Sequence, residues 1–119
     1  MIIQSAMTAT AKNLSPAIPE LMPLDQLKNA AECLKCASHP HRLRIIEILF
    51  QGKFTVDDIA GLCELSQPAT SGHLRLMEAK GLLKSTRYGR TVYYSVAEPH
   101  LKGIIDCIRD HFLDQQQTD

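Results

Sequence analysis

The chain has 119 residues, of which 45% are hydrophobic, and this length suits one domain with a modest core. Its formal net charge is zero, so the overall charge gives no sign of a nucleic-acid partner. No secretory signal pattern precedes the four cysteines and no apolar run is long enough to span a bilayer, so we expect a cytoplasmic protein with reduced thiols and no membrane partner.

The first third of the chain predicts an arm followed by two helices. Residues 1–20 are rich in Ser, Thr, Ala and Pro and show no periodicity, so we expect a mobile arm. Apolar residues at helical spacing predict a helix over residues 24–37. Ser38-His39-Pro40 interrupts this pattern, and Pro40 favours the first turn of a second helix that ends at residues 51–53.

The middle of the chain predicts two helices joined by a tight turn, which is a helix-turn-helix pattern. Thr55-Val56-Asp57-Asp58 resembles a capping box and predicts a short helix. Ser66 suits the N-cap of the next helix, Pro68 its first turn and Gly81 its end. Either this is an ordinary surface helix, or its polar side chains reach base edges and phosphates in a major groove. The candidate DNA-binding residues on it are Ser66, Gln67, Thr70, Ser71, His73 and Arg75.

Alternating residues from Leu83 to Val96 predict a β-hairpin with Arg87 and Arg90 at its tip. A basic hairpin directly after a recognition helix is the wing of a winged helix, so we expect both arginines to contact DNA. The alternative is that they are solvated charges that protect an edge strand. Residues 66–95 contain five basic residues against one acidic, whereas residues 96–119 contain two against five, which indicates two differently used surfaces.

Apolar residues from Leu101 to Phe112 predict a last amphipathic helix. Its apolar stripe is wide for the end of a small domain, and the helix over residues 24–37 has a similar stripe. We therefore expect these two helices to form a homodimer interface. The predicted fold is mainly α with a β-hairpin: a winged helix-turn-helix over residues 21–114 with four helices, two strands and a last helix. Residues 115–119 are expected to form a tail.

Three segments of the chain resemble the ArsR/SmtB family of bacterial repressors. They are residues 37–45, 65–74 and 89–95, in the family's order and spacing, and the resemblance extends over residues 24–113. It implies a homodimeric winged-helix repressor that leaves its operator when an inducer binds, and the inducer is often a metal ion. Because a two-fold protein reads a two-fold site, we expect an operator with an imperfect inverted repeat.

The resemblance implies two possible positions for a metal inducer. One family site uses thiolates near the start of the helix before the recognition helix. Here Thr55, Val56 and Asp57 occupy those positions, and residues 1–20 contain neither Cys nor His, so we expect no such site.

The other family site lies on the last helix and has the pattern Asp-x-His-x10-His-x2-(Glu or His). This chain matches the spacing, with Glu and Asp exchanged at the two ends, through Glu98, His100, His111 and Asp114. At ~1.5 Å per residue the two histidines are roughly 16 Å apart on one helix, too far to share an ion. Antiparallel packing of two such helices brings His100 of one chain next to His111 of the other. The resulting set suits Zn²⁺, with Co²⁺ or Ni²⁺ as alternatives; otherwise His100 caps a helix and His111 is a rim residue.

The cysteines offer a different sensor. Cys33, Cys36 and Cys107 lie on the two predicted interface helices and could approach one another to sense oxidants, reactive sulfur species or thiophilic metals. The alternative, favoured for Cys63, is that they are small buried hydrophobic residues. We expect no enzyme activity, because the sequence shows neither a nucleophile–base pair nor a His-Glu-x-x-His motif.

Overall fold

The computed structural model describes residues 19–117, and the side chains of residues 19–113. The predicted arm over residues 1–20 therefore lies outside the described residues, except for its last two. The described elements, in chain order, are α2 (Leu24–Ala37), α3 (Pro40–Leu49), β1 (Phe54–Thr55), α4 (Val56–Cys63), α5 (Gln67–Ala79), β2 (Leu83–Tyr88), β3 (Thr91–Val96) and α6 (Leu101–Gln117).

Local capping interactions explain where the central helices begin. At the start of α4, Thr55 and Asp58 each accept the other's backbone N–H, so the predicted capping box is confirmed. Ser66 Oγ accepts the N–H of Ala69 at 3.2 Å and caps α5, also as predicted. Gly81 follows α5 in a left-handed conformation with φ 81°, where a side chain would be strained.

The three strands form one antiparallel sheet in the order β1-β3-β2. The hairpin turn is Gly89-Arg90, because Tyr88 still pairs with Thr91. The two-residue strand β1, which pairs Phe54 with Tyr94, is an element the sequence analysis did not predict. This pairing attaches the segment before α4 to strand β3 of the hairpin.

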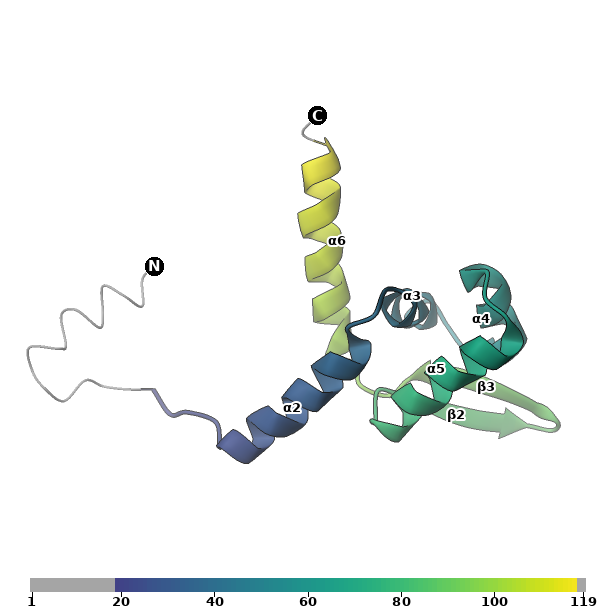
Figure 1. Cartoon of the computed structure of the whole chain (residues 1–119), viewed down its shortest axis with the longest axis horizontal. Coiled ribbons are helices and arrows are strands. Elements are labelled where there is room, and N and C mark those ends of the chain that lie inside the picture. The colour runs from purple at the N-terminus through teal and green to yellow at the C-terminus, as the bar shows by residue number, and fades with distance from the viewer. Residues whose placement is uncertain (1–18, 118–119) are drawn as a thin grey trace, which may run out of the picture.

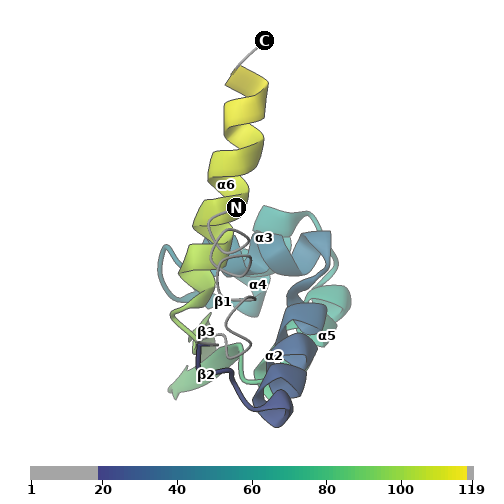
Figure 2. The same cartoon turned by 90° about the vertical axis from the view of Figure 1, so that its left-hand side faces the viewer.

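The core lies between α3, α4, α5 and the sheet. Its fully buried side chains come from all of these layers and include Ile45, Ile46, Ile59, Leu74, Met77, Leu82 and Leu83. Only the first part of α6 joins this core, through Leu101 and Ile105. The rest of α6 projects away from the body of the domain, while the hairpin extends in another direction (Figures 1 and 2).

This arrangement is a winged helix-turn-helix, as the sequence predicted. The helices α4 and α5 form the helix-turn-helix, with Glu64 in a left-handed conformation at the turn between them. The hairpin β2–β3 is the wing. None of the described helices is long and apolar enough to cross a membrane.

Candidate functional site

The start of α5 presents part of the predicted DNA-binding set to solvent. Gln67 and Arg75 are exposed and Ser71 is half-buried. Ser66 is exposed, but its hydroxyl is engaged in the N-cap bond to Ala69. Gln67, Ser71 and Arg75 therefore remain as side chains that can meet a nucleic acid from this helix.

The prediction that Thr70 faces the groove is wrong. Its side chain is 0% exposed, and its Oγ1 donates a hydrogen bond to the carbonyl of Ser66 at 2.9 Å. Positions 70, 74 and 77 share one helix face, and Leu74 and Met77 show that this face is turned toward the core. Thr70 thus supports the first turn of α5 from inside and cannot read bases.

His73 is half-buried and lies in a different environment from the one expected. Its Nδ1 accepts a hydrogen bond from Arg42 Nε at 3.1 Å, and its ring centroid is 4.9 Å from that of His39. Burial, followed by the charges of Arg42 and the neighbouring histidines, lowers the pKa of His73. His73 therefore connects α5 to the start of α3. No role was predicted for His39 or His41 from the sequence, although their His-x-His spacing was the available signal.

The wing carries unpaired positive charge. Arg87 and Arg90 are exposed, and neither has an ion-pair partner within residues 19–113. Lys53, just before β1, reaches the same hairpin: its Nζ is 3.3 Å from the hydroxyl of Tyr88 and 5.5 Å from the centre of that ring. Lys53 is an addition to the basic surface that the sequence analysis missed, since its place depends on the pairing of β1 with β3.

The predicted metal ligands are divided between the two ends of α6. Glu98 and His100 lie in the turn before the helix rather than on it, which corrects the expectation that both histidines belong to one helix. Glu98 Oε2 accepts the backbone N–H of His100 at 3.0 Å and lies 2.6 Å from its Nδ1. These contacts lower the pKa of the Glu98 carboxyl.

The far end of α6 carries the other two predicted ligands. His111 is exposed, and its ring meets that of Phe112 edge-on at 4.8 Å. Asp114 is part of α6, but its side chain lies outside the described set. About ten residues of helix at ~1.5 Å each separate the two ends, so one chain cannot bring all four ligands together.

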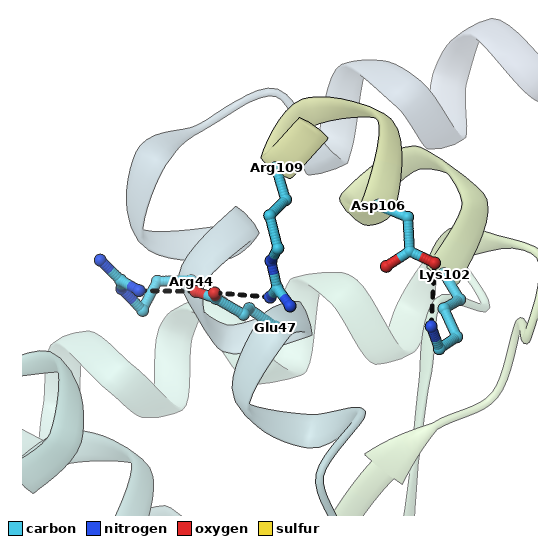
Figure 3. Close-up of polar contacts among 5 residues, drawn as sticks. All are labelled: Arg44, Glu47, Lys102, Asp106 and Arg109. Carbon is cyan, nitrogen blue, oxygen red and sulfur yellow. Dashed lines mark hydrogen bonds and ion pairs between the residues drawn. The ribbon is translucent and has the colours of Figure 1, made fainter. Parts of the chain in front are cut away.

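An ion-pair network attaches α6 to α3 (Figure 3). The carboxylate of Glu47 on α3 accepts a hydrogen bond from Arg109 Nη2 at 2.9 Å and another from Arg44 Nη1 at 2.5 Å. Along α6 itself, Lys102 Nζ pairs with Asp106 at 2.8 Å. Arg109 is two residues from His111, so this contact connects the far end of α6 to the core of the winged helix.

An apolar surface is exposed on α2 and on the projecting part of α6. A groove between α3 and α6 is lined by Leu43, Ile105, Ile108 and Phe112, among others. Ile105 is nearly buried within its own chain, whereas the side chain of Phe112 is 57% exposed. The large exposed apolar side chains on the two helices are Leu24, Leu27, Leu34, Phe112 and Leu113.

The structure separates the three cysteines of the predicted thiol site. Cys36 is buried in the core, Cys33 is half-buried with its Sγ 3.7 Å from the carbonyl of Lys80, and Cys107 is exposed on α6. Within one chain, the described cysteines do not form a group of three ligand atoms within 4.8 Å. Cys33 instead shares a groove with Glu98 and His100.

Comparisons with known proteins agree with this architecture. The family model "Bacterial regulatory protein, arsR family" matches residues 39–85. Over 93 residues the chain is 37% identical to a transcriptional repressor SmtB homolog of Synechocystis sp., which covers 78% of this chain and 70% of that protein. Over 91 residues it is 33% identical to a cadmium resistance transcriptional regulatory protein CadC homolog of Staphylococcus aureus, which covers 76% of this chain and 73% of that protein. The solved structure of HlyU from Vibrio cholerae matches with a TM-score of 0.68 at 26% identity, covering 74% of this chain and 96% of that one. This chain belongs to the ArsR/SmtB family of bacterial transcriptional regulators.

Proposed function

We propose that this chain is a homodimeric repressor that leaves its DNA operator when a metal ion, Zn²⁺ first among the candidates, binds between the α6 helices of two chains. The ligands are Glu98 and His100 of one chain with His111 and Asp114 of the other. The observation that carries this proposal is the placement of a carboxylate–imidazole pair at one end of α6 and a second imidazole at the other end.

The donor set suits such an ion. Glu98 holds His100 by Nδ1, which leaves Nε2 of that ring for a metal, as in many carboxylate–histidine metal sites. The contacts with His100 use Oε2 and lower the pKa of the Glu98 carboxyl, so the carboxylate form is favoured and its other oxygen can bind an ion. Two imidazoles and two carboxylates are compatible with tetrahedral Zn²⁺ and with Co²⁺ or Ni²⁺.

A dimer through α2 and α6 would cover the exposed apolar surface on those helices. Monomeric proteins rarely leave several large apolar side chains exposed on adjoining elements. Antiparallel packing of the two α6 helices is also what brings the opposite ends of the ligand set together. The homodimer and the metal site therefore support each other.

DNA binding would use a different surface, formed by α5 and the wing. Gln67, Ser71 and Arg75 would enter the major groove, and the basic wing, with Arg87, Arg90 and Lys53, would contact the phosphate backbone or the adjacent minor groove. This division fits the exposed polar start of α5 and the exposed arginines of the hairpin. A two-fold dimer would then require an operator with an imperfect inverted repeat.

Coupling between the two surfaces would pass through α6 and α3. Arg109 and Glu47 connect the far end of α6 to α3, and α3 contributes to the same core as α5. The ion would favour one distance between the two recognition helices, and DNA would favour another. DNA binding must therefore weaken metal binding by the same factor by which metal weakens DNA binding. Couplings of this kind are typically about 1–3 kcal/mol.

The test is a zinc titration of the protein–operator complex, comparing wild type with His111→Ala. The variant is expected to fold, dimerise and bind the operator, yet to remain bound when zinc releases the wild type. Equal release of both proteins by zinc would refute the proposed ligand set.

A thiol sensor is the second candidate, because Cys107 is exposed on α6 and Cys33 lines the groove that contains His100. One structural relative, HlyU, is named a transcriptional activator, so relatives differ in the direction of regulation. Cys33→Ser and Cys107→Ser should leave zinc release unchanged. If they abolish release by zinc or by an oxidant while His111→Ala does not, the thiol function replaces the metal function.

A further inference from the structure

Three histidines from two distant segments meet at the junction of α3 and α5. His39 is the N-cap of α3, His41 lies in its first turn, and His73 lies in the middle of the recognition helix α5. The ring centroids are 4.9 Å apart for His39 and His73, 5.6 Å for His39 and His41, and 6.1 Å for His41 and His73. One ring nitrogen from each residue lies within 4.8 Å of the others.

We propose that this cluster of His39, His41 and His73 is a second metal site, selective for divalent transition ions that prefer imidazole and separate from the ligands on α6. A three-imidazole set suits Zn²⁺, Co²⁺, Ni²⁺ or Cu²⁺ far better than Mg²⁺ or Ca²⁺. It leaves at least one coordination position for water, as open zinc sites do. The bound ion would fasten the recognition helix to the start of α3.

The protonation of His73 favours this role. Imidazole ligates a metal only when it is neutral, and burial, Arg42 and the two other histidines lower the pKa of His73. The lowered pKa favours the neutral form of His73, which is the form that ligates a metal. His39 is partly exposed and His41 is exposed, so an ion can reach the cluster from solvent.

Hydrogen bonds to the cluster define what an ion must displace. Arg42 Nε donates to His73 Nδ1 at 3.1 Å, and the backbone N–H of His41 donates to His39 Nδ1 at 3.1 Å. Metal binding at Nδ1 displaces these donors, and binding at Nε2 moves the ring proton to Nδ1, which can no longer accept them. Arg42 thus competes with the ion for His73 in both geometries.

This competition connects the site to the recognition helix. Arg42 also donates to the carbonyl of Cys36 at 3.0 Å, so it bridges the end of α2 and the middle of α5. When the ion binds, α5 exchanges its bond to Arg42 for bonds through the ion to His39 and His41. The position of α5 would then depend on metal through contacts that lie within one chain.

The experiment uses the full-length chain with His111→Ala, which removes a ligand of the α6 site. Cobalt and zinc are titrated against a competing chelator, and the cobalt absorption spectrum reports the ligand type. We expect one remaining ion per chain, with a spectrum of nitrogen and oxygen ligands and no thiolate charge-transfer band. Adding His41→Ala should remove that ion. Circular dichroism should show an unchanged fold, because the cap of α3 uses the backbone N–H of His41 and not its side chain.

A second variant tests the competition with Arg42. In the same His111→Ala background, Arg42→Met removes a positive charge and the donor to His73, so the remaining ion should bind at least tenfold more tightly. The proposal is overturned if His41→Ala leaves the number and affinity of bound ions unchanged. It is also overturned if His41→Ala weakens operator binding in chelator without affecting metal binding, because the cluster is then a phosphate contact.

Discussion

Glu98 Oε2 lies 2.6 Å from Nδ1 of His100 and also accepts the backbone N–H of that residue at 3.0 Å, in the turn directly before α6. The carboxylate thereby fixes both the backbone and the ring of its neighbour. Because an ionised carboxylate only accepts, the ring must donate from Nδ1, and its Nε2 lone pair is directed away from Glu98. The pair is thus organised before any partner helix arrives.

Glu98→Gln is expected to weaken zinc binding by about 10–100-fold, the usual effect of losing a carboxylate that orients a ligating histidine or binds the ion itself. The amide oxygen can still accept the N–H of His100, so the turn should persist. Competition with a chelating dye measures the affinity. Asp110→Asn is the matched control, since it removes one exposed acidic charge on α6 next to His111. Equal losses in both variants would indicate a general charge effect.

Arg90→Ala should weaken binding to operator and random DNA alike and reduce the salt dependence by about one phosphate contact. Arg90 is at the exposed turn of the wing, where a phosphate contact carries no sequence information. Ser71→Ala should instead change the ranking of operator variants. Fluorescence anisotropy over a series of salt concentrations measures both, and Lys102→Ala, which removes a cation on α6, is the control. A salt slope that Arg90→Ala leaves unchanged would place the wing outside the interface.

The sequence predicted the winged helix because the relevant signals are local. Capping residues mark the starts of α4 and α5, and period-two alternation marks the hairpin. The strand β1 was missed because two residues carry no periodicity. The error at Thr70 was avoidable, since its i+4 and i+7 neighbours, Leu74 and Met77, already indicate a core-facing position.

The histidine cluster could not be predicted in the same way. His39 and His73 are brought together by the packing of α3 against the helix-turn-helix, which no local pattern encodes. The separation of the cysteines likewise follows from tertiary packing, since Cys36 points into the core while Cys107 lies on the exposed part of α6.

Phe112→Asp should convert the protein to a folded monomer with little affinity for the operator. The side chain is 57% exposed in one chain, so a carboxylate there costs little in the monomer, whereas a dimer through α6 would bury it without a partner. Ile105 is unsuitable for this test because it already belongs to the core of its own chain. Sedimentation measures the association state, with Leu62→Asp on the exposed face of α4 as the control. A Phe112→Asp protein that remains a dimer would exclude this interface.

The stability of the metal-free protein should decrease as the pH falls through the range where His73 titrates. Burial and the charge of Arg42 lower the pKa of His73 in the folded chain, whereas an unfolded imidazole keeps its ordinary pKa of about 6.5. Between these two values the unfolded state binds more protons than the folded state, so protons favour unfolding. Above the unfolded pKa both states are neutral, and the penalty disappears.

His73→Gln removes this titration while keeping a polar side chain that can accept from Arg42. Urea unfolding in chelator at several pH values between 5 and 7.5 should therefore show that wild type loses stability toward acid more steeply than the variant. His41→Gln is the control, because its ring is exposed and forms no hydrogen bond among the described residues. Parallel pH profiles for wild type and His73→Gln would mean that His73 is as easily protonated in the folded chain as in the unfolded one.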